Sequence, residues 1–200
     1  MLTKTKSRGR IMSSSIIKPF LVSLPSPPNH THESSLNVLE LSLHVPPKSL
    51  CRDLALVFGS VENLYLIPTT QPSLCGSLLS WNDETAKEKD RLLEVFFFFC
   101  NELLSPIVDQ VNAEVGAEKP LSIDWIDPCS GLPMKTQTQV IYDEVASHSA
   151  LLKYTVSSAG GCKVMLHDRW GEGGYPATLV FSGTEDQARK ALAIVRDKFG

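Results

Sequence analysis

The chain has 200 residues, of which 42% are apolar and 20% are charged, and its formal net charge is -3. This length and balance are typical of one folded domain of about 150 to 170 residues with a tail. A general nucleic-acid binder is disfavoured, because affinity for phosphate needs clustered lysine and arginine side chains. We therefore expect no nucleic-acid partner.

The cysteines are odd in number and widely spaced, and they form no C-x-x-C pair. They are Cys51, Cys75, Cys100, Cys129 and Cys162. This pattern predicts neither a disulfide framework nor a zinc site. We expect a reducing compartment and no bound metal.

Residues 1–35 differ in composition from the rest of the chain. Their lysines and arginines all precede the first acidic residue, Glu33, in a stretch rich in serine and proline. Such a composition is typical of a mitochondrial transit peptide, although a plain disordered tail is an alternative. We predict a disordered, basic, transit-peptide-like leader over residues 1–35 and an α+β domain over residues 36–200.

The first elements are expected after this leader. Apolar and polar residues alternate from 39 to 45, which predicts a strand, and residues 48–58 have helical spacing that ends at Gly59. Residues 62–70 are predicted as a second strand, in which Pro68 indicates either the end of the strand or an edge position. Residues 71–80 are expected to form a loop.

A long helix is expected next. Ser80 is its predicted N-cap, and the apolar face continues to about Val115, with a bend at Pro106. The most apolar run within it, residues 92–104, contains Glu94 and Glu102 and is too short to span a bilayer. We therefore expect no membrane insertion.

The remainder of the chain is more strand-like. A turn is predicted at residues 127–131, and Thr184 with Gln187 forms a capping box for a C-terminal helix. The further candidate strands are residues 121–126, 138–143, 151–156, 163–167 and 177–181. This order predicts the α+β class, with one mixed, mostly antiparallel sheet packed with helices.

An acid/base group of Asp124, Asp127 and His167 is one candidate for catalysis. Nothing in the spacing brings these side chains together. Aspartate before Pro128 in a turn usually accepts backbone N–H groups, so Asp127 is interpreted as a turn former. We expect no catalytic residues.

The segment GGCKVMLHDRWG, residues 160–171, is the most informative part of the chain. Gly160 and Gly161 permit positive φ angles before Cys162, which would leave its thiol accessible, whereas a small buried core residue is the alternative. His167 lies five residues on and therefore faces the opposite side of a regular strand. A Cys–His dyad within this strand is disfavoured.

Two neighbouring features have structural interpretations. Trp170 is expected to be a core or rim anchor rather than a cofactor platform. The glycine-rich stretch at residues 171–174 lacks the strand-to-helix context of a phosphate-binding loop. Residue chemistry alone therefore leads to an α+β domain with a candidate accessible thiol.

Three blocks of the sequence resemble the CblD family of cobalamin-trafficking proteins, the methylmalonic aciduria and homocystinuria type D family. They are WNDE at 81–84 with the helix that follows, WIDPCSGL at 125–132, and GCKV at 161–164 continuing to Trp170-Gly171. Together they extend over about residues 36–182, in the family's order and at similar spacing. Beyond Phe181 the likeness is weaker.

The resemblance implies a flavin nitroreductase-like layered domain without bound flavin. It implies a non-enzymatic adaptor that docks on a CblC-type cobalamin-processing protein and directs cobalamin to methionine synthase or methylmalonyl-CoA mutase. The chain alone is then expected to bind no cofactor, and cobalamin would be reached through the partner. The family also implies a mitochondrial location with a further cytoplasmic pool.

One departure from the family pattern concerns the segment around Cys162. The best-known members carry two adjacent cysteines before Lys-Val, and the first is associated with a cobalt–sulfur contact, but this chain has Gly161 there and only Cys162 follows. Either Cys162 takes over the cobalt contact or this chain lacks it. The candidate partner contacts are Gly160, Gly161, Lys163, His167 and Trp170.

Two other functions stay open at this point. Cys162 and the nitroreductase likeness would also suit a thiol- or flavin-dependent redox enzyme. Alternatively, the fold could serve an unrelated partner in an organism that does not use cobalamin.

Overall fold

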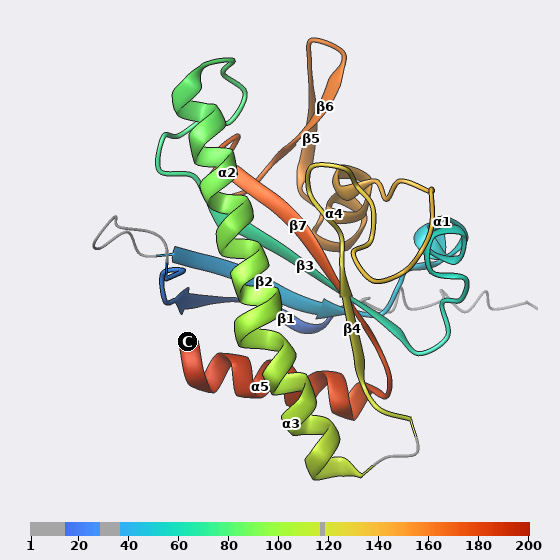
Figure 1. Cartoon of the computed structure of the whole chain (residues 1–200). Helices are drawn as coiled ribbons and strands as arrows, with labels where there is room; N and C mark the ends of the chain where they lie inside the picture. Colours follow the sequence, from blue (N-terminus) through green and yellow to red (C-terminus); the bar gives the residue numbers. More distant parts are fainter. Residues whose placement is uncertain (1–14, 29–36, 117–118) are drawn as a thin grey trace, which may run out of the picture.

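The computed structural model describes residues 15–28, 37–116 and 119–200. Within this part of the chain, a five-stranded sheet has the order β1-β2-β3-β7-β4, and each of its strand pairs is antiparallel (Figure 1). Its strands are β1 (Ser15–Leu24), β2 (Asn37–His44), β3 (Leu64–Pro72), β7 (Gly174–Ser182) and β4 (Ser122–Trp125). Strands β5 (Thr155–Ala159) and β6 (Cys162–Leu166) form a separate hairpin that projects beyond the sheet (Figure 1).

Helices lie on both faces of the sheet. They are α1 (Lys48–Phe58), α2 (Asp83–Phe98), the π-helical segment η1 (Phe99–Leu104), α3 (Ser105–Val115), α4 (Glu144–Leu152) and α5 (Glu185–Phe199). The larger core lies between the sheet and α2, η1, α3 and α5, and the smaller core lies under α1 and α4. This arrangement confirms an α+β domain with a mostly antiparallel sheet.

The alternation of side chains along the inner strands supplies both cores. On β3, Leu64 and Leu66 belong to the smaller core and Ile67 to the larger one. On β7, Val180 faces the smaller core and Phe181 the larger one, because successive residues point to opposite faces. Phe181 is fully buried, so its truncation to alanine would cost about 3 to 5 kcal/mol.

The predicted long helix is present and continuous from α2 through η1 to α3, and it ends at Gly116 as the pattern indicated. Its predicted N-cap was wrong, because the Asn82 side chain, not that of Ser80, accepts the Thr85 N–H at 2.8 Å. The π-helical segment ends just before Pro106, whose ring does not fit against the preceding turn of a regular α-helix. No helix in the described residues is both long and apolar enough to cross a membrane.

Strand β1 corrects the predicted leader. Residues 15–24 pair with β2 and bury Val22 and Leu24, so order begins inside the segment that was expected to be disordered. The basic charges of this segment masked an apolar strand. The rest of the predicted leader, residues 1–14 and 29–35, lies outside the described residues apart from the short stretch 25–28.

Two predicted strands near α4 were also wrong. Residues 138–143 belong to no strand, and within them Tyr142 is buried while Ile141 stays exposed. Residues 151 and 152 end helix α4, whose N-cap Asp143 accepts the Ala146 N–H at 2.8 Å, and β5 begins only at Thr155. The helix was missed because its apolar spacing is weak.

Pro68 lies neither at a strand end nor at an edge. It pairs with Thr178 in the middle of β3, an interior strand, and the pairing of β3 with β2 is interrupted between Leu66 and Thr69. The gap in that ladder accommodates a residue that has no N–H to donate. The remaining elements agree with the sequence, including α1 ending at Gly59 and the Thr184–Gln187 capping box of α5.

Candidate functional site

The Cys162 segment forms the tip of the β5–β6 hairpin. Ala159 pairs with Cys162 across a two-residue turn in which Gly160 and Gly161 have φ angles of 56° and 88°. Positive φ at both central positions is the geometry of a type I′ hairpin turn. A Cβ atom added to either glycine would meet nothing within 4 Å, so the backbone conformation rather than crowding favours glycine here.

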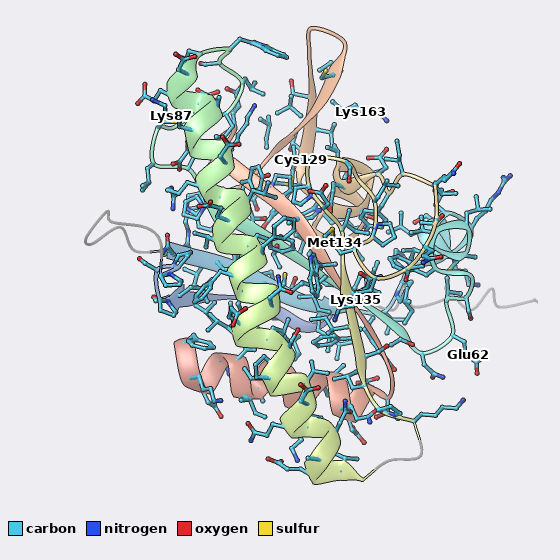
Figure 2. The ribbon with its side chains drawn as sticks, in the orientation of Figure 1. Glu62, Lys87, Cys129, Met134, Lys135 and Lys163 are labelled. Carbon is cyan, nitrogen blue, oxygen red and sulfur yellow. The ribbon has the colours of Figure 1, made fainter. Side chains whose placement is uncertain are left out.

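Cys162 is exposed, so of the two interpretations that the sequence left open the accessible thiol is correct and the small buried core residue is wrong. Lys163 is exposed too, and Figure 2 shows its side chain extending away from the hairpin ribbon. In contrast, Met165 and His167 are buried. The hairpin therefore has an exposed tip and a buried base, and about 16 Å of extended chain separates Cys162 from His167.

His167 is the centre of a buried cluster at the base of the hairpin. Its Nε2 lies 3.0 Å from Glu40 Oε1 on β2, and the Tyr154 hydroxyl donates to the same carboxylate oxygen at 2.8 Å. The ring stacks on Trp170 with centroids 4.2 Å apart and meets the Tyr154 ring edge-on at 4.7 Å. We call these four residues, Glu40, Tyr154, His167 and Trp170, the base cluster.

The hydrogen bonds decide the protonation of the His167 ring. Nδ1 accepts the backbone N–H groups of Arg169 at 3.1 Å and Trp170 at 3.2 Å, so this nitrogen carries no proton. The proton is then on Nε2, which donates to Glu40. Burial raises the pKa of Glu40, but the hydrogen bonds from His167 and Tyr154 and nearby positive charge outweigh this and leave it lowered.

These contacts hold His167 in place and leave little of its surface accessible to a partner or a substrate. Its exposed fraction is 4%, and the turn after it is closed by hydrogen bonds in both directions between the backbones of His167 and Gly171. Trp170 is half-buried against the ring, which confirms its predicted role as a rim anchor. Cys162 and His167 are far apart, but for a different reason from the predicted opposite faces, because His167 lies beyond the end of β6, at the base of the hairpin.

The candidate acid/base residues Asp124 and Asp127 have local structural roles. Asp124 is buried and accepts the backbone N–H groups of Trp125, Lys135 and Thr136. Asp127 accepts the N–H of Cys129 and both the N–H and the hydroxyl of Ser130, which builds the predicted turn. The carboxylate that His167 does contact, Glu40, was missed because 127 residues separate them and no local pattern links them.

The glycine-rich residues 171–174 join β6 to β7 and allow two loops to pack closely. A Cβ on Gly173 would lie 2.6 Å from the backbone oxygen of Gly76, and the Gly173 oxygen accepts the Ser73 N–H at 2.8 Å. This role needs no bound phosphate. Within residues 15–28, 37–116 and 119–200, no group of three or more His, Cys, Asp or Glu side chains is placed to hold a metal ion.

A second buried polar group lies between the sheet and α4. Both ring nitrogens of His148 face carbonyl oxygens, Glu144 O at 3.0 Å and Thr69 O at 3.1 Å, so only the protonated ring satisfies both. Burial lowers the pKa of His148, but the Glu144 side chain and these hydrogen bonds outweigh it and raise the pKa. Burial and the charge of His148 lower the pKa of His44 to about 4.

Comparison with known proteins matches this chain to the cobalamin trafficking protein CblD of three mammals. The chain is 29% identical to the cobalamin trafficking protein CblD of Rattus norvegicus over 154 residues, which are 74% of this chain and 48% of the rat protein. It is 28% identical to CblD of Mus musculus over 156 residues, with 75% and 48% covered, and 28% identical to CblD of Homo sapiens over 154 residues, with 74% and 48% covered. No protein-family model matches the chain.

These matches confirm the resemblance to the CblD family that the sequence blocks indicated. The chain spans about half the length of the curated relatives that it matches.

Proposed function

We propose that the chain acts in intracellular cobalamin metabolism as a non-enzymatic adaptor. The names of its relatives support a role in cobalamin trafficking, and the single structural observation behind the adaptor is the exposed Cys162 at the end of a projecting hairpin. In this proposal the hairpin tip docks on a CblC-type cobalamin-processing protein. The cobalamin then passes to methionine synthase or methylmalonyl-CoA mutase.

The tip suits contact with a group held by another protein. Its thiol stands at the first residue of β6, next to a turn whose glycines carry no side chains to block an approach. A thiolate is a soft ligand suited to transition metals, so Cys162 could contact the cobalt of a cobalamin held by the partner. The chain alone would then bind no cofactor.

The geometry also bears on the missing first cysteine. Gly161 lies in the turn, not in the strand, so strict strand alternation does not set its direction relative to Cys162. Adjacent residues of a regular strand face opposite sides, but because Gly161 lies in the turn this rule does not prevent Cys162 from taking the place of the missing cysteine. We propose that Cys162 makes the cobalt contact.

A size-exclusion experiment with a CblC-type protein loaded with cobalamin tests the adaptor. We expect a complex at micromolar concentrations, and the absence of one would count against docking. The absorption spectrum of the mixture tests the thiol. Cys162→Ser should abolish the spectral change, whereas Cys129→Ser, at the other exposed cysteine, should preserve it. An unchanged spectrum with the parent chain would exclude cobalt ligation by Cys162.

The exposed thiol is also the observation that favours a second function, a thiol- or flavin-dependent redox enzyme with a nitroreductase-like fold. Such an enzyme would be yellow after purification or would quench flavin fluorescence on mixing. A colourless chain that leaves flavin fluorescence unchanged would reject the flavin-dependent form. Loss of a measured reductase activity in Cys162→Ser would instead support the thiol-dependent form.

We propose a mitochondrial location with a cytoplasmic pool, as the family resemblance implies. Because residues 15–24 belong to the sheet, the part of the predicted leader that can be removed without disturbing the fold is residues 1–14. Deleting these residues from a fluorescent fusion should abolish mitochondrial targeting. Unchanged targeting after this deletion would contradict the proposal.

A further inference from the structure

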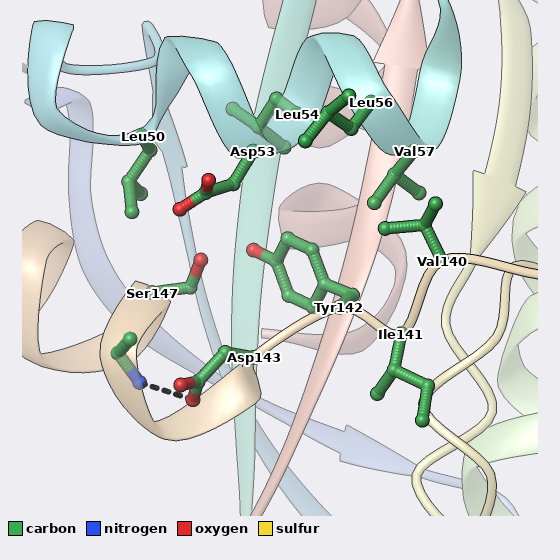
Figure 3. A pocket seen from close by; sticks show the side chains of 11 residues that line it. Leu50, Asp53, Leu54, Leu56, Val57, Val140, Ile141, Tyr142, Asp143 and Ser147 are labelled. Atoms are coloured by element: carbon green, nitrogen blue, oxygen red, sulfur yellow. Dashed lines mark hydrogen bonds between the residues drawn. The ribbon is translucent and has the colours of Figure 1, made fainter.

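A small pocket opens between α1 and the segment that leads into α4 (Figure 3). These two elements lie away from the tip of the β5–β6 hairpin (Figure 1). Its walls are mainly apolar and include Leu50, Leu54 and Val57 of α1. The cavity volume is about 120 Å³. An apolar cavity of about 150 Å³ holds a benzene molecule, so this pocket has room for about five non-hydrogen atoms.

One end of the pocket is polar. Figure 3 shows the Tyr142 hydroxyl turned toward the side chains of Asp53 and Ser147, which come from α1 and α4. Tyr142 is 6% exposed, and its hydroxyl forms no hydrogen bond of ordinary length and angle among the described residues, although the side chains of Ser147 and Thr178 lie near it. A buried hydroxyl without a well-formed hydrogen bond is unfavourable, so a donor placed between these side chains would stabilise the site.

The charge of the lining is one-sided. Asp53 and Asp143 both line the pocket, and no lysine or arginine does. Asp143 is engaged as the N-cap of α4, whereas Asp53 forms no hydrogen bond or ion pair with any residue in the described part of the chain. Asp53 is exposed and its carboxylate is free to pair with a cation, which would complement its charge.

We propose that this pocket binds a lysine side chain presented by a partner protein. The lysine side chain has five non-hydrogen atoms, of which the carbons would pack on Leu50, Leu54 and Val57. Its ammonium group has three donors for the oxygens of Asp53, Tyr142 and Ser147. A guanidinium group is wider and would need more acceptors than this end provides.

The rim identifies the source of the lysine as a protein. Leu56 and Ile141 line the pocket from two different segments and are 59% and 69% exposed, so two large apolar side chains at its border face water (Figure 3). A free amine would fill the pocket and leave this rim in water. A polypeptide would cover it with apolar residues on either side of the lysine, as an anchor residue does in a protein interface.

The proposal is independent of the role of Cys162, and titrations monitored by amide NMR shifts of the whole chain test it. The first probe is N-acetyl-lysine methylamide, compared with the norleucine analogue, which lacks only the ammonium group. We expect the lysine probe to shift amides around Leu54 and Ser147 and to bind about fivefold more tightly than the norleucine probe. Equal affinities would overturn the proposed recognition of the ammonium group.

Two variants refine the titration. Asp53→Asn should remove the preference for lysine, whereas Glu62→Gln, at an exposed acid just beyond α1, should keep it. An unchanged preference in Asp53→Asn would overturn the proposal. Because both positions are exposed, both variants are expected to fold.

The last comparison distinguishes a partner protein from a free amine. An acetylated Leu-Lys-Leu peptide should bind at least about threefold more tightly than the lysine probe, and Leu56→Ser should remove this gain. If n-butylammonium binds more tightly than the peptide, the pocket takes a free amine and the proposed partner is wrong. Absence of shifts with any probe at about 50 mM would exclude a side-chain site altogether.

Discussion

The tip and the base of the β5–β6 hairpin belong to one short stretch of sequence but have opposite physical character. The tip, with Gly160, Gly161 and Cys162, is exposed to solvent, which leaves the thiol accessible. The base holds His167 at 4% exposure in contact with Glu40, Tyr154 and Trp170. Cys162 and His167 are thus close in sequence but differ in role, because Cys162 is free to contact another molecule and His167 stabilises the fold.

The largest expected effect tests the base. His167→Ala removes the Nε2 donor from the partly buried Glu40 carboxylate and also removes the stacked ring beside Trp170. We expect the free energy of unfolding in urea to fall by about 3 kcal/mol. In a chain that already carries Glu40→Gln, His167→Ala should lower the free energy of unfolding by less, because the neutral glutamine leaves no carboxylate charge without a partner. A loss below about 1 kcal/mol in the parent chain would show that the base cluster is not structural.

The next effect is a loss of stability in acid that comes from the buried residue His44 on β2. The pKa of His44 is lowered to about 4 in the folded chain, against about 6.5 when unfolded. Since the unfolded chain takes up the proton first, stability falls as the pH decreases from about 6.5 to about 4, by up to about 3 kcal/mol. Urea unfolding across this range measures the slope, which His44→Gln should remove and Cys162→Ser should not.

Two further groups affect other parts of the pH profile. The lowered pKa of Glu40 means that its contribution is present above the ordinary value of 4.5 and is lost as the pH falls further. The raised pKa of His148 acts in the opposite direction, because its contribution is present below pH 6.5 and is lost as the pH rises through the folded-state pKa. A profile that stays flat through both ranges would contradict the hydrogen-bond assignments of these groups.

A smaller effect is expected in the turn at the tip. Gly161→Ala places a Cβ at a φ of 88°, which should cost about 1 to 2 kcal/mol through backbone strain alone, since no neighbour crowds it. Gly160→Asn is the matched control, because asparagine tolerates a φ of 56° and Asn-Gly suits a type I′ turn. Equal thermal stability of the two variants would indicate that this turn geometry is wrong.

The smallest effect is expected at the thiol. Cys162→Ser should change the free energy of unfolding by less than about 0.5 kcal/mol, because the side chain is exposed. The thiol should nevertheless react readily with a maleimide in the native chain, whereas Cys100, which is fully buried and whose pKa is raised by burial, should react only after unfolding. A substantial loss of stability in Cys162→Ser would remove the distinction between tip and base.

Local patterns predicted most of the elements and the character of the tip. The alternation in β2, the capping box of α5 and the glycines of the hairpin turn depend on residues within a few positions of each other. Strand β1 was missed because the basic residues around it indicated a leader, and helix α4 was missed because its apolar spacing is weak. The strand expected over residues 138–143 was wrong because alternation predicts an extended chain but does not supply a pairing strand.

The amino-acid sequence was sufficient to indicate the α+β class, the resemblance to the CblD family and an accessible Cys162, because each depends on local order along the chain. The tertiary structure alone decided that His167 is held by Glu40 from a strand 127 residues earlier. It also decided that the Tyr142 hydroxyl is buried beside Asp53 of α1. Such contacts arise because elements that are distant in sequence pack on one sheet. The spacing of residues along the chain therefore does not predict them.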